Sequence, residues 1–234
     1  MKEGRGVEKV TLMLRERIDH LLRQQKLYHP EKRILIALAG VPGSGKSTIC
    51  AALLQALREH GIDDVSVLPM DGFHHTRATL SSFSDPDLAF QKRGAPFTFD
   101  AMALLRHVVT VKQLPVTECD EPEIVHTAPS FDHAVGDPVL DAISISSRCR
   151  IVILEGNYVL LNEKPWNKIA ELADDRWFVD VVPEVARERI VQRHIQAGIE
   201  KTRDAATLRA DNNDMPNGEY IRSNLIEPNI RILN

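Results

Sequence analysis

The chain has 234 residues, 43% of them hydrophobic and 26% charged, which is typical of one globular domain with a full α/β core. The net charge of −4 provides no basic field to attract nucleic acid, so no such partner is expected. No apolar run reaches the roughly 18 residues of a membrane span. The first residues are polar, and we therefore expect a cytoplasmic protein without membrane contact.

Apolar periodicity divides the chain into alternating helices and strands. Apolar residues at three- and four-residue steps predict a helix over residues 7–27, and Pro30 ends it. Short apolar runs predict buried strands at residues 34–39, 65–70, 151–154 and 177–182. Helical patterns occupy residues 48–60, 99–111, 165–173 and 183–197, and a last helix or strand follows from residue 220. This alternation predicts an α/β three-layer fold around a mainly parallel five-stranded sheet.

Residues 40–47, GVPGSGKS, match the phosphate-loop pattern G-x-x-x-x-G-K-[ST] at every fixed position. Glycines let successive backbone N–H groups point inward at phosphate oxygens. Lys46 is expected to reach the β- and γ-phosphates, and the Ser47 hydroxyl to bind Mg²⁺. The pattern predicts ATP and Mg²⁺ as cofactors, with a nucleotide site made of Gly40, Gly43, Ser44, Gly45, Lys46, Ser47 and Thr48.

Two acidic residues directly follow predicted strands. Asp71 comes after the second strand, and Glu155 after the third. Ligands of parallel sheets bind at the carboxyl ends of the strands, which places both acids near the phosphate loop. Asp71 can accept the proton of an attacking hydroxyl there, although Asp-Gly is also a common turn pair. Glu155 can hold Mg²⁺ directly or through water.

Three segments lack a regular period. Residues 74–98 predict a loop with a short helix, and the proline-containing residues 114–142 predict a small β-ribbon or long excursion beside the core. Residues 209–220, rich in asparagine and aspartate, favour a loop of Asx turns, and amides that read adenine are the functional alternative. We expect residues 1–30 to form a helix packed on a single domain of residues 31–234, or on the second subunit of a homodimer.

The motifs GVPGSGKS, MDGFHHTR, RGAPFTFD, FDHAVGDP and ILEGNYVLL occur in this order. Together they resemble the family of uridine kinase, phosphoribulokinase and bacterial-type pantothenate kinase, over residues 34–221, and most of all its uridine-kinase-like branch of fungi and bacteria. The resemblance implies a P-loop NTPase fold with a helical lid. It also implies transfer of the ATP γ-phosphoryl group to a hydroxyl of a nucleoside, sugar or related metabolite. Asp71 would be the base, and Glu155 would assist Mg²⁺.

By the same resemblance, the acceptor is bound by the segments that follow these strands. The candidate residues are His74, Arg77, Arg93, Asp100, Asp132 and His133. Each has a structural alternative: a helix cap for Asp100, turn chemistry for Asp132 and His133, solvation for His74, and ion pairs for the arginines. The aromatic walls expected for the acceptor pocket are Phe73, Phe97 and Phe131.

The helix predicted at residues 183–197 resembles the lid of these kinases. Arg189 and Arg193 are four residues apart and therefore share one face. In related kinases such arginines close over the phosphates and stabilise the charge that develops in transfer, whereas surface charge is the structural alternative. Uridine kinases have a longer arginine–aspartate signature where this chain has Arg193 and His194, so the acceptor does not follow from the resemblance.

Two functions from different classes remain. The first is a small-molecule kinase, with Asp71, Lys46, Arg189 and Arg193 as catalytic residues. The second is a nucleotide-dependent switch or a degraded kinase scaffold that acts through a partner. The chain has no N-K-x-D motif for reading guanine, and intact Lys46, Ser47 and Glu155 argue against a degraded site. The sequence therefore favours the kinase.

Overall fold

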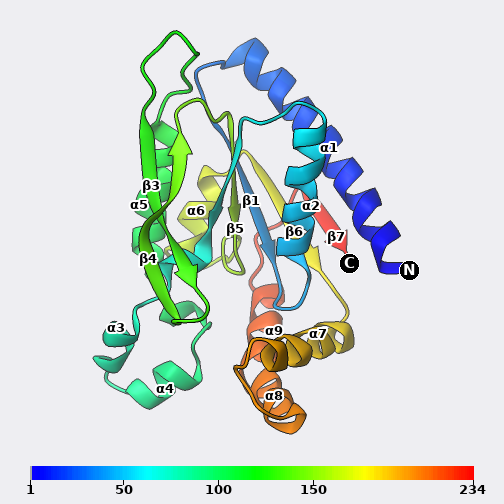
Figure 1. Ribbon diagram of the computed structural model, residues 1–234, viewed down its shortest axis with the longest axis vertical. Helices are drawn as coiled ribbons and strands as arrows, with labels where there is room; N and C mark the ends of the chain where they lie inside the picture. Colours follow the sequence, from blue (N-terminus) through cyan, green and yellow to red (C-terminus); the bar gives the residue numbers. More distant parts are fainter. Residues whose placement is uncertain (1) are drawn as a thin grey trace.

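A parallel sheet forms the centre of the molecule. The computed structural model describes residues 2–234, with side chains from residue 6 onward. Five strands stand in the order β2-β5-β1-β6-β7, and all neighbours run parallel (Figure 1). They are β1 (Ile34–Gly40), β2 (Val65–Pro69), β5 (Ile151–Glu155), β6 (Asp175–Asp180) and β7 (Ile230–Leu233). The predicted three-layer α/β fold is confirmed, and β7 supplies the fifth strand.

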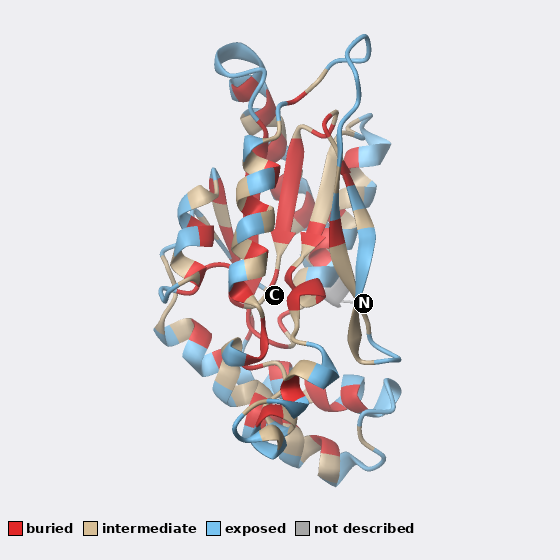
Figure 2. Cartoon of the chain, turned by 90° about the vertical axis from the view of Figure 1, so that its left-hand side faces the viewer, coloured by how far each residue is buried: buried red, intermediate tan, exposed pale blue. Residues whose placement is uncertain are grey.

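Helices cover both faces of the sheet because side chains of the central strand alternate between two apolar clusters. Leu35 and Ala37 of β1 belong to the cluster that also contains residues of α5 and α6. Ile36 and Leu38 belong to the cluster shared with α1 and α2. The four helices are α1 (Lys2–Tyr28), α2 (Lys46–Glu59), α5 (Ala101–Gln113) and α6 (Trp166–Leu172). Figure 2 shows the resulting buried interior in red between partly exposed helices.

Helix α1 is fixed to the sheet by a buried carboxylate as well as by its apolar face. Arg17 donates from Nε to Asp175 Oδ2 at 2.8 Å and from Nη2 to Oδ1 at 3.0 Å. Trp177 Nε1 donates to the same Oδ2 at 2.8 Å. The hydrogen bond to Asp175 raises the pKa of Arg17. The paired charges offset the cost of burying Asp175 completely. Across residues 2–234, no helix is long and apolar enough to cross a membrane.

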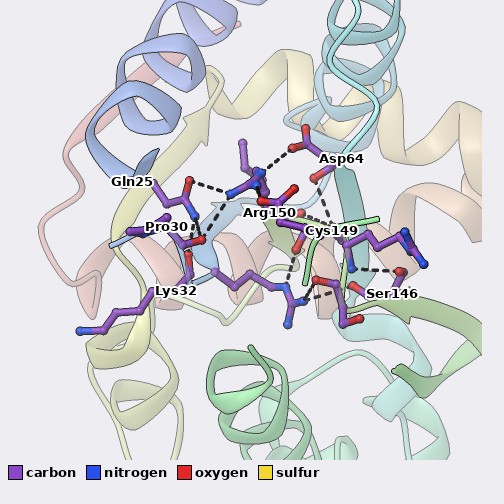
Figure 3. A network of polar contacts seen from close by, with 12 residues as sticks. Gln25, Pro30, Lys32, Asp64, Ser146, Cys149 and Arg150 are labelled. Carbon is purple, nitrogen blue, oxygen red and sulfur yellow. Dashed lines mark hydrogen bonds and ion pairs between the residues drawn. The ribbon is translucent and has the colours of Figure 1, made fainter. Parts of the chain in front are cut away.

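At the amino ends of the strands, a polar network joins the chain entering β1 to the chains entering β2 and β5 (Figure 3). Arg150 donates to Gln25 Oε1 at 3.4 Å and to Pro30 O at 3.3 Å, and it pairs with Asp64 at 3.5 Å. Gln25 Nε2 in turn donates to Pro30 O at 2.7 Å. These bonds hold the strand starts together at the end of the sheet opposite the phosphate loop.

The predicted β-ribbon is present as β3 (Val125–Asp132) and β4 (Asp137–Ser146), which pair antiparallel. It packs against the turn η1 (Met70–Phe73) at the end of β2. Gly72 makes this contact feasible, since a Cβ there would lie 2.1 Å from Pro129 O. Residues 74–98 contain two short α-helices, α3 (Arg77–Ser81) and α4 (Pro86–Gln91), and a 3₁₀ turn, η2 (Pro96–Thr98), where one short helix was expected.

The lid consists of three helices and one wider turn at the carboxyl end of the sheet (Figure 1). They are α7 (Pro183–Gln196), α8 (Arg203–Arg209), a π-helical turn (Ala210–Asp214) and α9 (Met215–Ser223). The loop predicted for residues 209–220 is therefore wrong. Ala206 and Ala210 are fully buried against Ile190 and Val191 of α7, and this packing outweighs the weak helix propensity of the asparagines and aspartates.

Candidate active site

A cleft with a volume of about 700 Å³ opens at the carboxyl ends of β1, β2 and β5, beneath the lid. These strands are neighbours in the sheet, so the loops that follow them meet at one edge. The cleft is lined by the whole loop from Gly43 to Thr48, by Asp71 and by both lid arginines, Arg189 and Arg193. Residues far apart in sequence thus converge as the motifs predicted.

The phosphate loop connects β1 to α2 through left-handed glycines. Gly43 has φ 74° and Gly45 has φ 83°. A Cβ on Gly43 would lie 2.6 Å from Ala186 O, so the loop also packs tightly against the lid helix α7. Ser44 Oγ is buried and has no hydrogen-bond partner within the described chain. A curled backbone with an unused buried hydroxyl fits a ligand rich in oxygen atoms, such as a triphosphate.

A cation, a hydroxyl and a carboxylate meet at the start of α2. Lys46 Nζ lies 3.4 Å from Glu155 Oε1, and Ser47 Oγ donates to the same oxygen at 3.1 Å. Both charged side chains are largely shielded, with exposures of 16% and 14%. A carboxylate and a hydroxyl at this separation suit Mg²⁺, which takes one or two carboxylates and completes its shell with water and phosphate oxygens.

Asp71 lies in the turn η1 and also lines the cleft, so its turn role and its chemical role are compatible. His74 follows it, and their contact runs between His74 Nδ1 and the Asp71 carbonyl, at 2.8 Å. The imidazole packs on Phe99 at 3.9 Å and on Phe131 at 4.6 Å between ring centroids. Burial lowers the pKa of His74. His74 therefore holds the turn that carries Asp71.

Arg93 and His133 also line the cleft, as the resemblance implied. Arg93 lies with its guanidinium 5.4 Å from the centre of the Phe131 ring. Burial lowers the pKa of Arg93. His133 meets Phe131 edge-on at 5.2 Å, so both side chains gather around the same ring of the β-ribbon.

Three other candidates lie outside the cleft lining and make local contacts. Asp100 Oδ1 caps α5 by accepting from Ala103 N at 2.7 Å. Asp132 Oδ1 accepts from Ala134 N at 2.8 Å and shapes the turn of the ribbon. Arg77 lies over Phe90 at 5.5 Å. The cap and turn alternatives describe the contacts of Asp100 and Asp132, whereas Arg77 contacts an aromatic ring rather than the expected ion-pair partner. Of the expected aromatic walls, Phe73 is in the core, Phe97 lines a separate hollow, and Phe131 reaches the cleft.

The two lid arginines differ in their surroundings. Arg189 Nη1 donates to Gly43 O at 3.3 Å, which ties α7 to the phosphate loop. Arg193 is 59% exposed, and its Nη2 lies 3.9 Å from Asp214 Oδ1. Arg187 points away and pairs with Asp211 through two bonds of 2.6 Å. Arg189 and Arg193 thus face the cleft together, and Arg187 does not line it.

Sequence reasoning did not single out Asn157, His194 or Asp214 of the cleft, and it raised Asn213 only as one of the amides of residues 209–220. The Oδ1 atom of Asn157 is buried without a partner in the described chain. His194 Nε2 lies 3.4 Å from Asp214 Oδ2, and burial lowers the pKa of His194 and raises that of Asp214. The motif ILEGNY contained Asn157, but no spacing rule singles out an amide whose importance depends on what surrounds it.

Comparison with known proteins agrees with this geometry. The model of the "Phosphoribulokinase / Uridine kinase family" matches residues 35–206. The "Putative uridine kinase C227.14" of Schizosaccharomyces pombe is 42% identical over 209 residues, covering 89% of this chain and 86% of the relative. YggC of Escherichia coli is 31% identical over 212 residues, covering 90% of this chain and 82% of YggC.

A solved structure gives the same result for the fold. The crystal structure of YFH7 from Saccharomyces cerevisiae is similar with a TM-score of 0.82 at 25% identity, covering 96% of this chain and 99% of that chain. The family model spans most of the chain, residues 35–206. The chain therefore belongs to the phosphoribulokinase and uridine kinase family, and it is an ATP-dependent kinase.

Proposed function

We propose that this kinase transfers the γ-phosphoryl group of ATP to a hydroxyl of a small molecule, with Asp71 as the general base. The observation that carries the proposal is the placement of Asp71 in one cleft with Lys46 and Ser47, whose side chains both contact Glu155. The volume of about 700 Å³ accommodates a nucleotide and a small acceptor together.

The nucleotide half of the cleft is the phosphate loop. Its backbone N–H groups and Lys46 would bind the phosphates, and Ser47 and Glu155 would hold Mg²⁺. When bound, Mg²⁺ neutralises charge on the β- and γ-phosphate oxygens. The ion pair of Lys46 with Glu155 keeps both side chains oriented toward this region. Phosphate binding and Mg²⁺ binding are thus assigned to side chains that already contact one another.

We assign the acceptor to the part of the cleft that is lined by His74, Arg93, Phe131 and His133, which we call the acceptor half. The Asp71 carboxylate would take the hydroxyl proton as the oxygen attacks the γ-phosphorus. His74 fixes the backbone of this turn and so limits the positions that the carboxylate can reach. Arg189 and Arg193 would stabilise charge on the transferring group and exclude water from it.

The test is an ADP-release assay with nucleosides, sugars, sugar phosphates, glycerate and pantothenate as acceptors. Asp71→Asn should lower acceptor phosphorylation by about 100-fold or more, with ATP binding unchanged, because only the proton acceptor is lost. Asp132→Asn is the matched control, since its side chain can keep the ribbon turn and lies outside the cleft. Full activity in Asp71→Asn would reduce Asp71 to a turn residue. Tight ATP binding without turnover of any acceptor would favour the switch or scaffold.

A further inference from the structure

The acceptor half of the cleft contains a buried cation that the protein itself compensates incompletely. Arg93 has a side-chain exposure of 14%. Its Nη2 lies 3.1 Å from His75 O and 3.5 Å from Asp137 Oδ1, and its Nε is buried without a partner in the described chain. A desolvated guanidinium normally gains strong charged hydrogen bonds, often two to one carboxylate. Arg93 has one long contact with a carboxylate.

Asp137, the carboxylate beside Arg93, is itself shared. Asp137 Oδ1 also accepts from the backbone N–H of Arg77 at 2.7 Å. The guanidinium of Arg77 is close enough to act on Arg93, where its charge adds to burial in lowering the pKa of Arg93. A Cβ on Gly136 would lie within 3.9 Å of Nη1 of both arginines, so the two cations converge on the tip of the ribbon. The one carboxylate beside Arg93 is therefore shared with the backbone of Arg77, which leaves the Arg93 guanidinium incompletely compensated.

The aromatic rings that line the cleft are already packed. Phe131 contacts His74, His133 and the Arg93 guanidinium. Phe99 contacts His74 on its face and Tyr158 and Trp166 at steeper angles. A nucleobase acceptor gains much of its binding from stacking on an open aromatic face. Among the described residues that line the cleft, neither phenylalanine offers such a face.

Asn157 adds a neutral polar group to the lining of the cleft. It follows Glu155 by two residues, and its Oδ1 is buried without a partner in the described chain. Burying an amide oxygen unpaired is costly, and a ligand hydroxyl would remove that cost. The cleft therefore offers a cation and an amide to the acceptor, while the two described phenylalanines that line it have no open face.

We infer that the acceptor is a small aliphatic hydroxy compound with an anionic group, a carboxylate or a phosphate ester, and that Arg93 binds this anion. Asn157 accepts a hydrogen bond from a hydroxyl of the same molecule. The inference rests on the proposed function. In the reaction, the acceptor oxygen forms a bond to the γ-phosphorus, the bond from the γ-phosphorus to the bridging oxygen breaks, ADP leaves, and the hydroxyl proton passes to Asp71.

Matched pairs of acceptors test the charge requirement. Glycerate is compared with glycerol, gluconate with glucose, pantothenate with pantothenol, and ribulose 5-phosphate with ribulose, and uridine serves as the neutral aromatic acceptor. The anionic member of at least one pair should have a kcat/KM about 100-fold above its neutral partner. The carboxylate pairs and the phosphate pair separate the two anion types. Higher turnover of uridine or of the neutral members would overturn the inference.

Variants of Arg93 test the residue itself. Arg93→Gln should raise the acceptor KM by about 100-fold, leave the KM for ATP unchanged and remove the preference for the anion. Arg93→Lys should restore part of the preference, since it keeps the charge and loses the planar fork. Arg148→Gln is the control, because Arg148 pairs with Glu123 outside the cleft. A changed KM for ATP with an unchanged acceptor KM would assign Arg93 to the nucleotide.

Calorimetric titration separates this inference from the proposed function. The four anions are titrated into wild type and Arg93→Gln, each saturated with Mg²⁺ and ADP. Binding that depends on Arg93 without any ADP release in the assay would support the anion site and contradict the kinase reaction. Turnover of neutral acceptors unaffected by Arg93→Gln would support the reaction and overturn the anion site. No anion binding in the saturated wild type would also overturn it.

Discussion

Asn213, in the π-helical turn of the lid, donates from Nδ2 to the carbonyl of Arg93 at 2.9 Å. Lys92 adds a second bond in the opposite direction, from Nζ to Asn212 O at 2.5 Å. The lid is therefore tied to the segment that carries Arg93, across the mouth of the cleft. Single π-helical turns are frequent at functional sites, and this one presents Asn213 to that segment.

Asn213→Ala should impair both substrates together, because the lid loses its hold on the acceptor segment. We expect kcat/KM for ATP and for the acceptor each to fall by about 10-fold, with a smaller change in thermal stability. Steady-state kinetics with each substrate varied in turn measures this. Asn212→Ala is the control, because its side chain is exposed and only its carbonyl contacts Lys92. Equal effects of the two substitutions would contradict the role of Asn213.

Gly43→Ala should abolish nucleotide binding. The added Cβ would meet Ala186 O at 2.6 Å, and φ 74° is unfavourable for alanine. We expect the Kd for ATP to rise by about 100-fold or more, measured by titration calorimetry. Gly61→Ala is the control, since Gly61 has φ 73° and no atom within 4 Å of a Cβ. That control should cost only about 1 kcal/mol of stability. Normal ATP binding by Gly43→Ala would show that the phosphate loop has room for a Cβ at this position.

Ser47→Ala should weaken the use of Mg²⁺ more than the binding of ATP. The hydroxyl that donates to Glu155 Oε1 at 3.1 Å is the proposed magnesium ligand. The Mg²⁺ concentration for half-maximal ADP release should rise by about 10-fold. Ser47→Thr keeps the hydroxyl and should restore the wild-type requirement. An unchanged Mg²⁺ dependence in the alanine variant would remove Ser47 from the metal site.

The contact between α5 and the β-ribbon should be sensitive to acid. His107 Nδ1 lies 3.0 Å from His126 Nε2, and burial lowers the pKa of both side chains. Arg106 and Arg33 act in the same direction, and Asp141 opposes them at His107. The unfolded chain then binds more protons than the folded one once the pH falls below about 6.5, so stability decreases from there toward the lowered folded pKa values.

Urea unfolding at several pH values checks this dependence. His107→Gln should reduce the slope of unfolding free energy against pH by up to one proton in the window below about pH 6.5. His20→Gln is the control, because His20 is exposed on α1. The same slope in wild type and His107→Gln would show that this pair does not set the acid limit.

Arg33→Met should destabilise the fold more than the same substitution at an exposed arginine. Arg33 is 1% exposed, and burial lowers its pKa. Its guanidinium donates to five carbonyls, those of Val111, Leu114, Ser146, Ser147 and Cys149. Leaving these oxygens unpaired should cost about 3–5 kcal/mol in urea unfolding. Arg148→Met, at an exposed ion pair, should cost about 1 kcal/mol or less. A similar cost for both would contradict the buried role.

The parts of the fold that could be predicted from sequence are those with local signals. The phosphate loop has a fixed spacing, and β1 and β5 are short apolar runs buried along almost their whole length, whereas the edge strand β2 is mostly half-buried. The helices at residues 203–223 could not be delimited from sequence, because the aspartates and asparagines at residues 211–214 are locally poor for helix, and this part of the lid gains its stability from burial against α7.

The residues of the candidate site likewise fall into those that could be placed from sequence and those that could not. Asp71 and Glu155 could be placed because strand ends of a parallel sheet converge by rule. Asp100 and Asp132 make cap and turn contacts, and the sequence allowed these roles as well as a role in binding the acceptor. Asn157 could not be singled out, since its unpaired Oδ1 is a property of the packed structure.

The strand order has a consequence for biosynthesis. The central strand β1 pairs only with β5 and β6 within the described sheet, and both lie far later in the chain. During translation, at about 5–20 residues per second, the apolar segment ILIALAG waits for many seconds without a partner. Exposed, unpaired apolar strands are prone to pair with other chains. The arrangement that centres the phosphate loop in the sheet thus lengthens the time during which the nascent chain is prone to aggregation.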